Sequence, residues 1–153
     1  MIINDVLDKE AFGFLESLPA EWGATEEELR EVEDQLGVRL PAPLRELMLR
    51  TGRGMHMRWL FSDDSIPPLG RLVGLQDLAV EIIEGEPLPL RPTFPFVTLD
   101  VSDGGGFAFA RAGHSEDDAE VFWYQELHGF DCGAGCSLRR TIVEAVWRVL
   151  HRV

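Results

Sequence analysis

The sequence is poor in basic residues, and this shortage limits the partners it can bind. Only 14 of its 153 residues are Lys or Arg, against 27 Asp and Glu, so the formal net charge is -13. Phosphate groups repel such a chain, which argues against nucleic acid and anionic membranes as partners. The same charge favours association with a basic protein. We therefore expect a protein partner, no nucleic acid and no membrane.

Long apolar runs and an export signal are also missing. No apolar stretch of the sequence approaches the roughly 20 residues needed to cross a bilayer. The first residues, MIINDVLDKEAFGFL, carry acids where the basic region of a signal peptide would lie. We therefore expect a cytoplasmic protein, in which the two cysteines stay reduced.

Residues with catalytic or metal-binding chemistry are few and unfavourably spaced. His128, Cys132 and Cys136 have a ligand-like spacing and His114 could be a fourth ligand, but structural zinc sites use tighter CxxC pairs. The alternative is a pair of free thiols in a glycine-rich loop. Residues 103–106 lack the Lys and Ser or Thr of a phosphate-binding loop. We therefore expect no catalytic, cofactor-binding or metal-binding residues, and no enzymatic activity.

The first half of the chain has the spacing of helices. Apolar residues recur on one side of a helical wheel over residues 5–18. A second helix begins after Thr25, which can form a capping box with Glu28, and it ends at Gly37. A third helix follows Pro41. The residues expected to be buried here are Leu29, Val32, Leu36, Leu44 and Leu47.

The second half changes to the pattern of strands. Segments 95–100, 106–111 and 120–125 are β-branched and aromatic, with Phe107 expected in the core and Trp123 and Tyr124 on opposite faces. The other expected elements are a strand at 55–61, a helix at 75–83 and a C-terminal helix opened by Ser137. We predict one α+β domain over residues 1–153, with N-terminal helices, a small mainly antiparallel β-sheet and a C-terminal helix packed on it.

One segment gives the sequence a resemblance to a known group. Residues 24–54, ATEEELREVEDQLGVRLPAPLRELMLRTGRG, resemble the helix, "LG…LP" turn, second helix and terminal glycine of the SUKH superfamily, which includes fungal cell-wall assembly regulators and bacterial toxin-immunity proteins. The matching positions are Glu33, Gly37, Leu40, Pro41, Leu44, Leu47 and Gly52. The family often has Asn where this chain has Thr51. The likeness continues more loosely through residues 74–82, 95–110 and 120–125.

The resemblance implies a fold and a general mode of action. Members look like non-catalytic binding modules, many of which neutralise intracellular toxins by direct contact. Their binding surfaces vary, so the resemblance assigns no partner-binding residue. For Glu33 it implies a structural, hydrogen-bonding role at a junction between elements.

Acidic residues are segregated along the chain. Residues 1–36 hold 11 acids and 2 bases, whereas residues 37–60 hold five arginines and one acid. On a helical wheel, Glu27, Glu31 and Asp34 point away from the apolar stripe. Two interpretations stay open: a solvated helix face, or a contact surface for a basic partner. Glu116, Asp117 and Asp118 belong to a second acidic cluster.

The sequence therefore predicts a protein-binding domain. We expect an immunity protein that neutralises a cytoplasm-acting bacterial toxin, with a basic toxin domain as the partner. The alternative is a regulatory adaptor that binds an endogenous protein. The expected partner-binding residues are Glu27, Glu31, Asp34, Glu116, Asp117 and Asp118. The sequence does not indicate whether the protein is a monomer or an oligomer.

Overall fold

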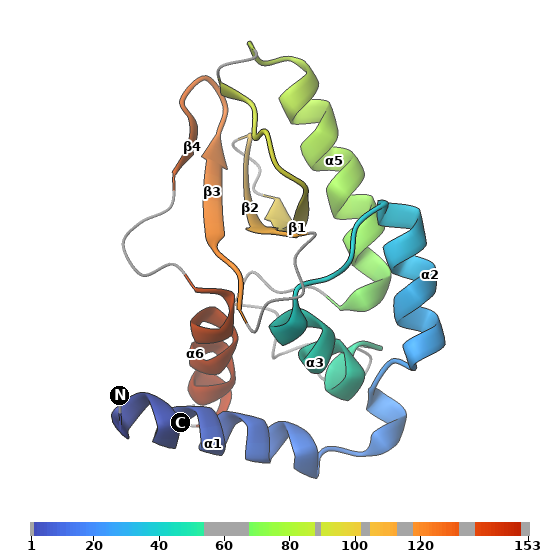
Figure 1. Cartoon of the computed structure of the whole chain (residues 1–153), viewed down its shortest axis with the longest axis vertical. Coiled ribbons are helices and arrows are strands. Elements are labelled where there is room, and N and C mark those ends of the chain that lie inside the picture. Colours follow the sequence, from blue (N-terminus) through green and yellow to red (C-terminus); the bar gives the residue numbers. More distant parts are fainter. Residues whose placement is uncertain are drawn as a thin grey trace.

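Along the sequence, the described part of the chain forms a series of helices, then a sheet, then a last helix (Figure 1). The computed structural model describes residues 2–53, 68–87, 90–101, 105–112, 118–131 and 137–150, and the strand expected at 55–61 lies outside these ranges. The helices are α1 (Ile2–Ser17), η1 (Ala20–Trp22), α2 (Glu26–Leu36), α3 (Ala42–Thr51), η2 (Leu69–Arg71), α5 (Leu72–Glu84) and α6 (Leu138–Leu150). The strands are β1 (Phe96–Val101), β2 (Gly106–Arg111), β3 (Val121–Gln125) and β4 (Gly129–Asp131).

The sheet is antiparallel and follows the chain order β1-β2-β3-β4. The three strands expected from the alternating pattern are confirmed, and the α+β fold class with them. The fourth strand, β4, was not predicted. It has only three residues, which is too short for an alternating pattern to show. A bulge between Thr98 and Asp100 interrupts the pairing of β1 with β2.

The two faces of the sheet border two different apolar clusters. On one face, Val97, Ala108 and Ala110 join the core that α1, α3 and α6 also supply. On the other, an aromatic cluster around Phe107 and Tyr124 packs against α5. Tyr124 is fully buried, whereas its neighbour Trp123 is 43% exposed, which confirms the expected alternation.

The C-terminal helix α6 meets the sheet through this shared core. Its main contacts are with α1 and α3, which lie beside it at the lower end of the molecule in Figure 1. The sequence predicts this helix packed on the sheet itself. Its buried residues Leu138, Ile142 and Val146 still belong to the same cluster as Val97 of β1.

The expected core residues are mostly confirmed. Leu29, Leu44, Leu47 and Phe107 are buried. Val32 and Leu36 are only partly buried, because α2 lies at the outer side of the molecule, where its neighbours among the described elements are α3, α5 and η2. The prediction of full burial for these two residues was therefore too strong.

A side chain from α5 occupies the outer edge of β1. The Gln76 Nε2 group donates to the carbonyl oxygen of Phe96 at 3.0 Å. Its Oε1 atom accepts from the backbone N–H of Thr98 at 2.8 Å and from the Thr98 hydroxyl at 2.8 Å. β1 is an outer strand of the described sheet, so this amide takes the hydrogen bonds that a neighbouring strand would make.

Candidate functional site

Helix α2 is fixed at both ends by the caps that the sequence predicted. The Thr25 hydroxyl accepts from the backbone N–H of Glu28 at 3.1 Å, and the Glu28 carboxylate accepts from the backbone N–H of Thr25 at 3.1 Å. Gly37 ends the helix with φ 74°, a left-handed conformation that glycine adopts without steric cost. The direction in which each α2 side chain points is thereby set.

Two acids of α2, Glu26 and Glu33, interact with residues of the same chain at the junction between α2 and α3. The carboxylate of Glu33, which is buried, accepts from the backbone N–H of Leu40 at 2.7 Å. It also accepts from the Arg45 guanidinium at 3.4 Å, and Glu26 pairs with the same guanidinium at 3.1 Å. The structural role that the resemblance implied for Glu33 is confirmed.

A third acid of α2, Glu28, belongs to the cap. Besides its bond to Thr25, it pairs with the Arg53 guanidinium at 3.2 Å. The hydrogen bond from the Thr25 backbone lowers the pKa of the Glu28 carboxylate below 4.5, and Arg53 lowers it further. A carboxyl whose pKa is depressed by folding adds stability above its unfolded pKa and loses it as the pH falls through the folded pKa.

Glu28→Gln is therefore expected to lower the free energy of unfolding at pH 7, by at most about 1 kcal/mol because the ion pair is exposed. The difference from the parent should shrink as the pH falls below about 4.5, since the parent then loses the same charge. Urea denaturation across a pH series measures this. A difference that stays constant from pH 7 to pH 3 would contradict it, and Glu31→Gln is the control because Glu31 has no ion pair among the described residues.

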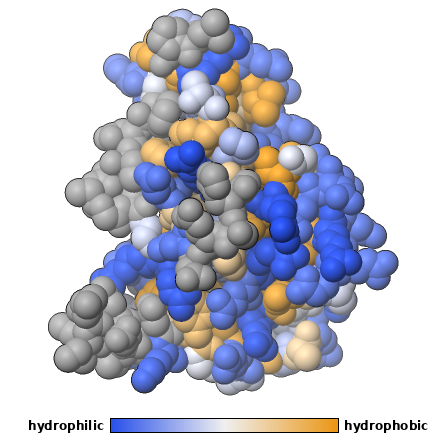
Figure 2. Space-filling view, in the orientation of Figure 1, coloured by the Kyte–Doolittle hydropathy of each residue, from blue (hydrophilic) through white to orange (hydrophobic). Residues whose placement is uncertain are grey.

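The remaining three acids of α2 form what we call the acidic ridge: Glu27, Glu31 and Asp34. All three are exposed, and within the described ranges none makes an ion pair. Their spacing of four and three residues places them along one side of the helix. The side of the molecule where α2 lies in Figure 1 is mainly hydrophilic (Figure 2). The structure thus leaves free the same three α2 acids that the helical wheel pointed outward.

The acidic ridge does not help α2 to fold. Like charges four residues apart repel each other by a few tenths of a kcal/mol. Asp34 lies near the C-terminal end of the helix, where the helix dipole disfavours a negative charge and the last turn holds no basic residue. The position of these carboxylates is therefore not explained by helix stability.

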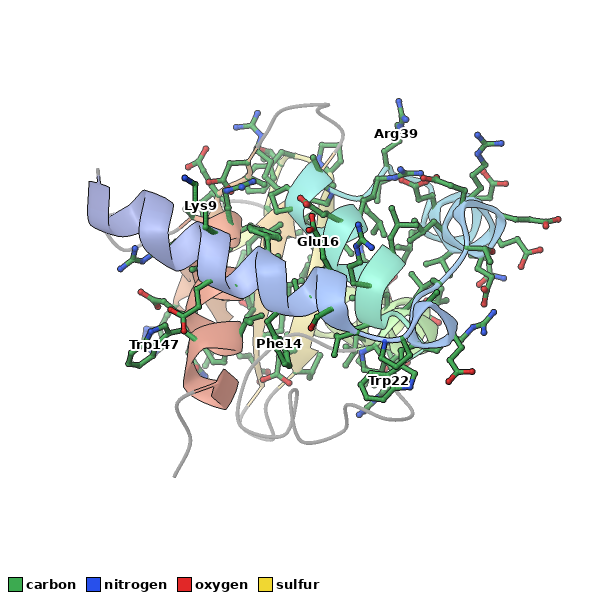
Figure 3. The ribbon with its side chains drawn as sticks, turned by 90° about the horizontal axis from the view of Figure 1, so that it is seen from below. Lys9, Phe14, Glu16, Trp22, Arg39 and Trp147 are labelled. Carbon is green, nitrogen blue, oxygen red and sulfur yellow. The ribbon has the colours of Figure 1, made fainter. Side chains whose placement is uncertain are left out.

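A polar groove of about 760 Å³ borders the ridge and shares Asp34 with it. Its lining residues are Glu26, Arg30, Glu33, Asp34, Gly37, Val38, Arg39 and Arg45. Arg45 is neutralised by Glu26 and Glu33, whereas Arg30 and Arg39 have no ion pair within the described residues. Arg39 points away from the body of the protein (Figure 3). This surface therefore offers free groups of both signs side by side.

The second acidic cluster expected from the sequence is only partly described. Glu116 and Asp117 lie outside the described ranges. The Asp118 carboxylate is used within the fold, because it accepts from the backbone N–H groups of Ala119 at 2.7 Å and Arg139 at 2.9 Å and from the Ser137 hydroxyl. Asp118 thus holds the start of α6, where its charge also suits the helix dipole.

Of the four residues considered for metal binding, the structure describes only His128. His114, Cys132 and Cys136 lie outside the described ranges, and His128 is exposed in the turn between β3 and β4. Among the residues that the structure describes, no group of three His, Cys, Asp or Glu side chains is placed to hold a metal ion. None of the described helices is long and apolar enough to cross a membrane.

Exposed apolar side chains are a feature that the sequence analysis missed. In the described part of the chain, the large ones are Leu78, Val80, Trp123, Leu127 and Trp147. Leu127 is 75% exposed and lies in the turn between β3 and β4. The Gly129 that follows this turn is the one sequence feature that could have indicated a hairpin there.

The chain matches a known family model over most of its length. The model of the SMI1 / KNR4 family (SUKH-1) matches residues 23–137, which run from just before α2 to the residue before α6. No curated protein and no solved structure matches the chain.

Proposed function

The chain belongs to the SMI1/KNR4 family (SUKH-1), and on that premise we propose that it acts by binding another protein in the cytoplasm, as an immunity protein that neutralises a bacterial toxin. The acidic ridge of α2 is the contact surface, and a basic toxin domain is the partner. The family is generally non-catalytic, and this role needs no chemistry from the chain itself. An acidic face inhibits by covering a basic active site or by occluding its substrate.

The observation that carries the proposal is the division of the α2 acids into two sets. Glu26, Glu28 and Glu33 are paired with arginines of the same chain. The ridge acids are not paired within the described residues, and their charges repel one another. A basic partner would relieve that repulsion. Its binding would therefore recover the electrostatic free energy that the repulsion costs the isolated chain.

The groove beside the ridge supports a specific contact rather than a purely electrostatic one. Free arginines next to Asp34 would reject a partner that is positive throughout. A partner would need acidic groups opposite Arg30 and Arg39 and basic groups opposite the ridge. Long-range attraction by the acids would mainly raise the rate of encounter, and the groove would fix the orientation.

Replacing Glu27 by Gln, Glu31 by Gln and Asp34 by Asn together is expected to slow association with the partner by about tenfold or more at low salt. Folding should survive, because the side chains are exposed and keep their size. Near 0.5 M salt the rates of variant and parent should converge, because the Debye length falls to a few ångströms. The partner is first identified by pull-down and mass spectrometry from the native cell, and stopped-flow mixing with the purified partner measures the rates.

A matched control carries the same change in net charge elsewhere. Glu46, Asp77 and Glu81 are exposed acids on α3 and α5, and their triple change to Gln, Asn and Gln should slow association much less. Equal rates for the two triple variants would mean that overall charge, not the ridge, attracts the partner. Equal rates for the ridge variant and the parent at low salt would leave the ridge as a solvated helix face. A captured partner without toxic activity would fit the regulatory adaptor instead.

A further inference from the structure

The turn between β3 and β4 holds a residue that turn geometry does not favour. The backbone N–H of His128 donates to the carbonyl oxygen of Gln125 at 3.0 Å, so Glu126 and Leu127 are the central residues of a β-turn. Leu127 has φ 70°, the one positive φ outside glycine in the described chain. A positive φ at the second central position is characteristic of a type II turn, which favours Gly or Asn there. Leucine has a Cβ atom, unlike Gly, and lacks the short polar side chain of Asn. Its bulk therefore makes a positive φ unfavourable.

Burial of the Leu127 side chain does not offset the free-energy cost of this backbone conformation. Leu127 is 75% exposed, more than any other large hydrophobic residue in the described ranges, where the next is Leu78 at 49%. An apolar side chain in water gains nothing from its position in the isolated chain. The local backbone and the exposure thus both oppose leucine at position 127.

A buried carboxylate holds the Leu127 backbone in place. The N–H of Leu127 donates to Oε1 of Glu86 at 3.1 Å, and Glu86 is only 3% exposed. Glu86 Oε2 and the Tyr124 hydroxyl are both buried without a hydrogen-bond partner in the described part of the protein. Burial raises the pKa of the Tyr124 hydroxyl, and the charge of Glu86 raises it further. Burying a carboxylate costs free energy. Here the buried Glu86 carboxylate holds the turn between β3 and β4.

The far side of the hairpin is fixed as well. Gly129 has φ 76°, and a Cβ atom there would lie 3.3 Å from the Leu90 side chain, so the start of β4 packs closely on the segment between α5 and β1. The turn that carries the exposed leucine is therefore hydrogen-bonded to the fold before the turn ends and closely packed against it just after. A binding group held in advance in its bound position loses less entropy when it binds.

We propose that Leu127 is an anchor residue that enters an apolar pocket on the partner protein, and that basic groups flank this pocket. The charge around the turn supports the second part: Glu126 and Glu84 are exposed, whereas the nearby Arg91 side chain is bonded to the backbone oxygens of Glu84 and Glu86. The acidic surroundings and the net charge of -13 disfavour an anionic lipid surface. The inference rests on the proposed function in so far as the chain binds a protein, but not on the ridge.

The test uses the full chain in its native cell and then in purified form. A benzophenone-bearing amino acid is placed at position 127, 31 or 78, and the protein that it captures on irradiation is purified. The parent, Leu127→Asn and Leu78→Gln are then compared for binding to that protein. Asn tolerates the left-handed conformation, so Leu127→Asn should fold at least as stably as the parent by thermal denaturation. Its complex should dissociate about tenfold faster with little change in association rate.

Leu78→Gln is the matched control, since it removes an exposed leucine from α5 and should leave the dissociation rate nearly unchanged. Capture at 127 together with faster dissociation of Leu127→Asn supports the anchor, even where position 31 captures nothing and the ridge is thereby excluded. Capture at 31 but not at 127 keeps the proposed function and overturns the anchor. Equal dissociation of Leu127→Asn and Leu78→Gln also overturns it. So does binding of the parent, but not of Leu127→Asn, to phosphatidylglycerol vesicles with no protein captured at 127.

Discussion

Gly23→Ala is expected to lower the free energy of unfolding by about 3 kcal/mol. The backbone of Gly23 is extended, with φ -86° and ψ 150°, so alanine could adopt its conformation. The obstacle is space, because the added Cβ would overlap the carbonyl oxygen of Leu49 and lie 2.7 Å from the carbonyl carbon. The adjacent Ala24 N–H donates to the Met48 oxygen at 2.9 Å, which holds the two backbones together. Neither backbone can move away without breaking this bond.

Gly13→Ala is the matched control for this substitution. Gly13 is exposed within α1, and no atom lies within 4 Å of the position of its Cβ. Alanine there should raise stability by about 0.5–1 kcal/mol, because glycine is a poor helix former. Urea denaturation followed by circular dichroism measures both variants. Equal stability of the two would show that the approach of the η1 segment to α3 is not as close as described.

Glu33→Ala is expected to destabilise the protein by a similar amount, about 3 kcal/mol. The variant leaves the buried N–H of Leu40 without its acceptor at 2.7 Å, and it leaves Arg45 with Glu26 alone. Glu33→Gln should lose roughly half as much, since its amide oxygen can still accept from Leu40 while its charge is gone. The midpoint of denaturation should move with little change in the denaturant slope.

Glu31→Ala serves as the control for Glu33→Ala because both glutamates lie on α2. Glu31 is exposed and makes no ion pair within the described ranges, so its loss should change stability by no more than about 0.5 kcal/mol. Comparable losses for the two alanine variants would show that the α2–α3 junction does not depend on the Glu33 carboxylate. A selective loss for Glu33 would separate structural acids of α2 from those of the ridge.

The features that could be predicted from the sequence are those set by neighbouring residues. The capping box joins residues three positions apart, and the left-handed end of α2 needs only Gly37. A helical wheel is enough to show that Glu27, Glu31 and Asp34 point outward, because helix geometry fixes the angle between successive side chains. These predictions depend on distances within one or two helical turns.

The features that were missed depend on residues far apart in the sequence. The sequence predicts Asp118 only as part of an acidic contact surface, and it does not indicate that the Asp118 carboxylate bonds to Ser137 and Arg139. The Leu127 N–H donates to the carboxylate of Glu86, 41 residues earlier, and no local pattern links the two. The wheel likewise identifies the outward side of α2 but cannot show that Glu26 pairs with Arg45.

The Gln76 amide on β1 bears on how the molecules behave when they are crowded together. Unpaired backbone groups along the outer edge of a sheet are a template on which a second chain can add a strand, and repeated addition yields fibrils. Here the Phe96 carbonyl and the Thr98 N–H are already occupied by Gln76. At the opposite edge of the described sheet, β4 is only three residues long, which offers little for another chain to extend. Within the described part of the chain, neither edge of the sheet therefore presents a long unpaired strand on which another copy could add its own.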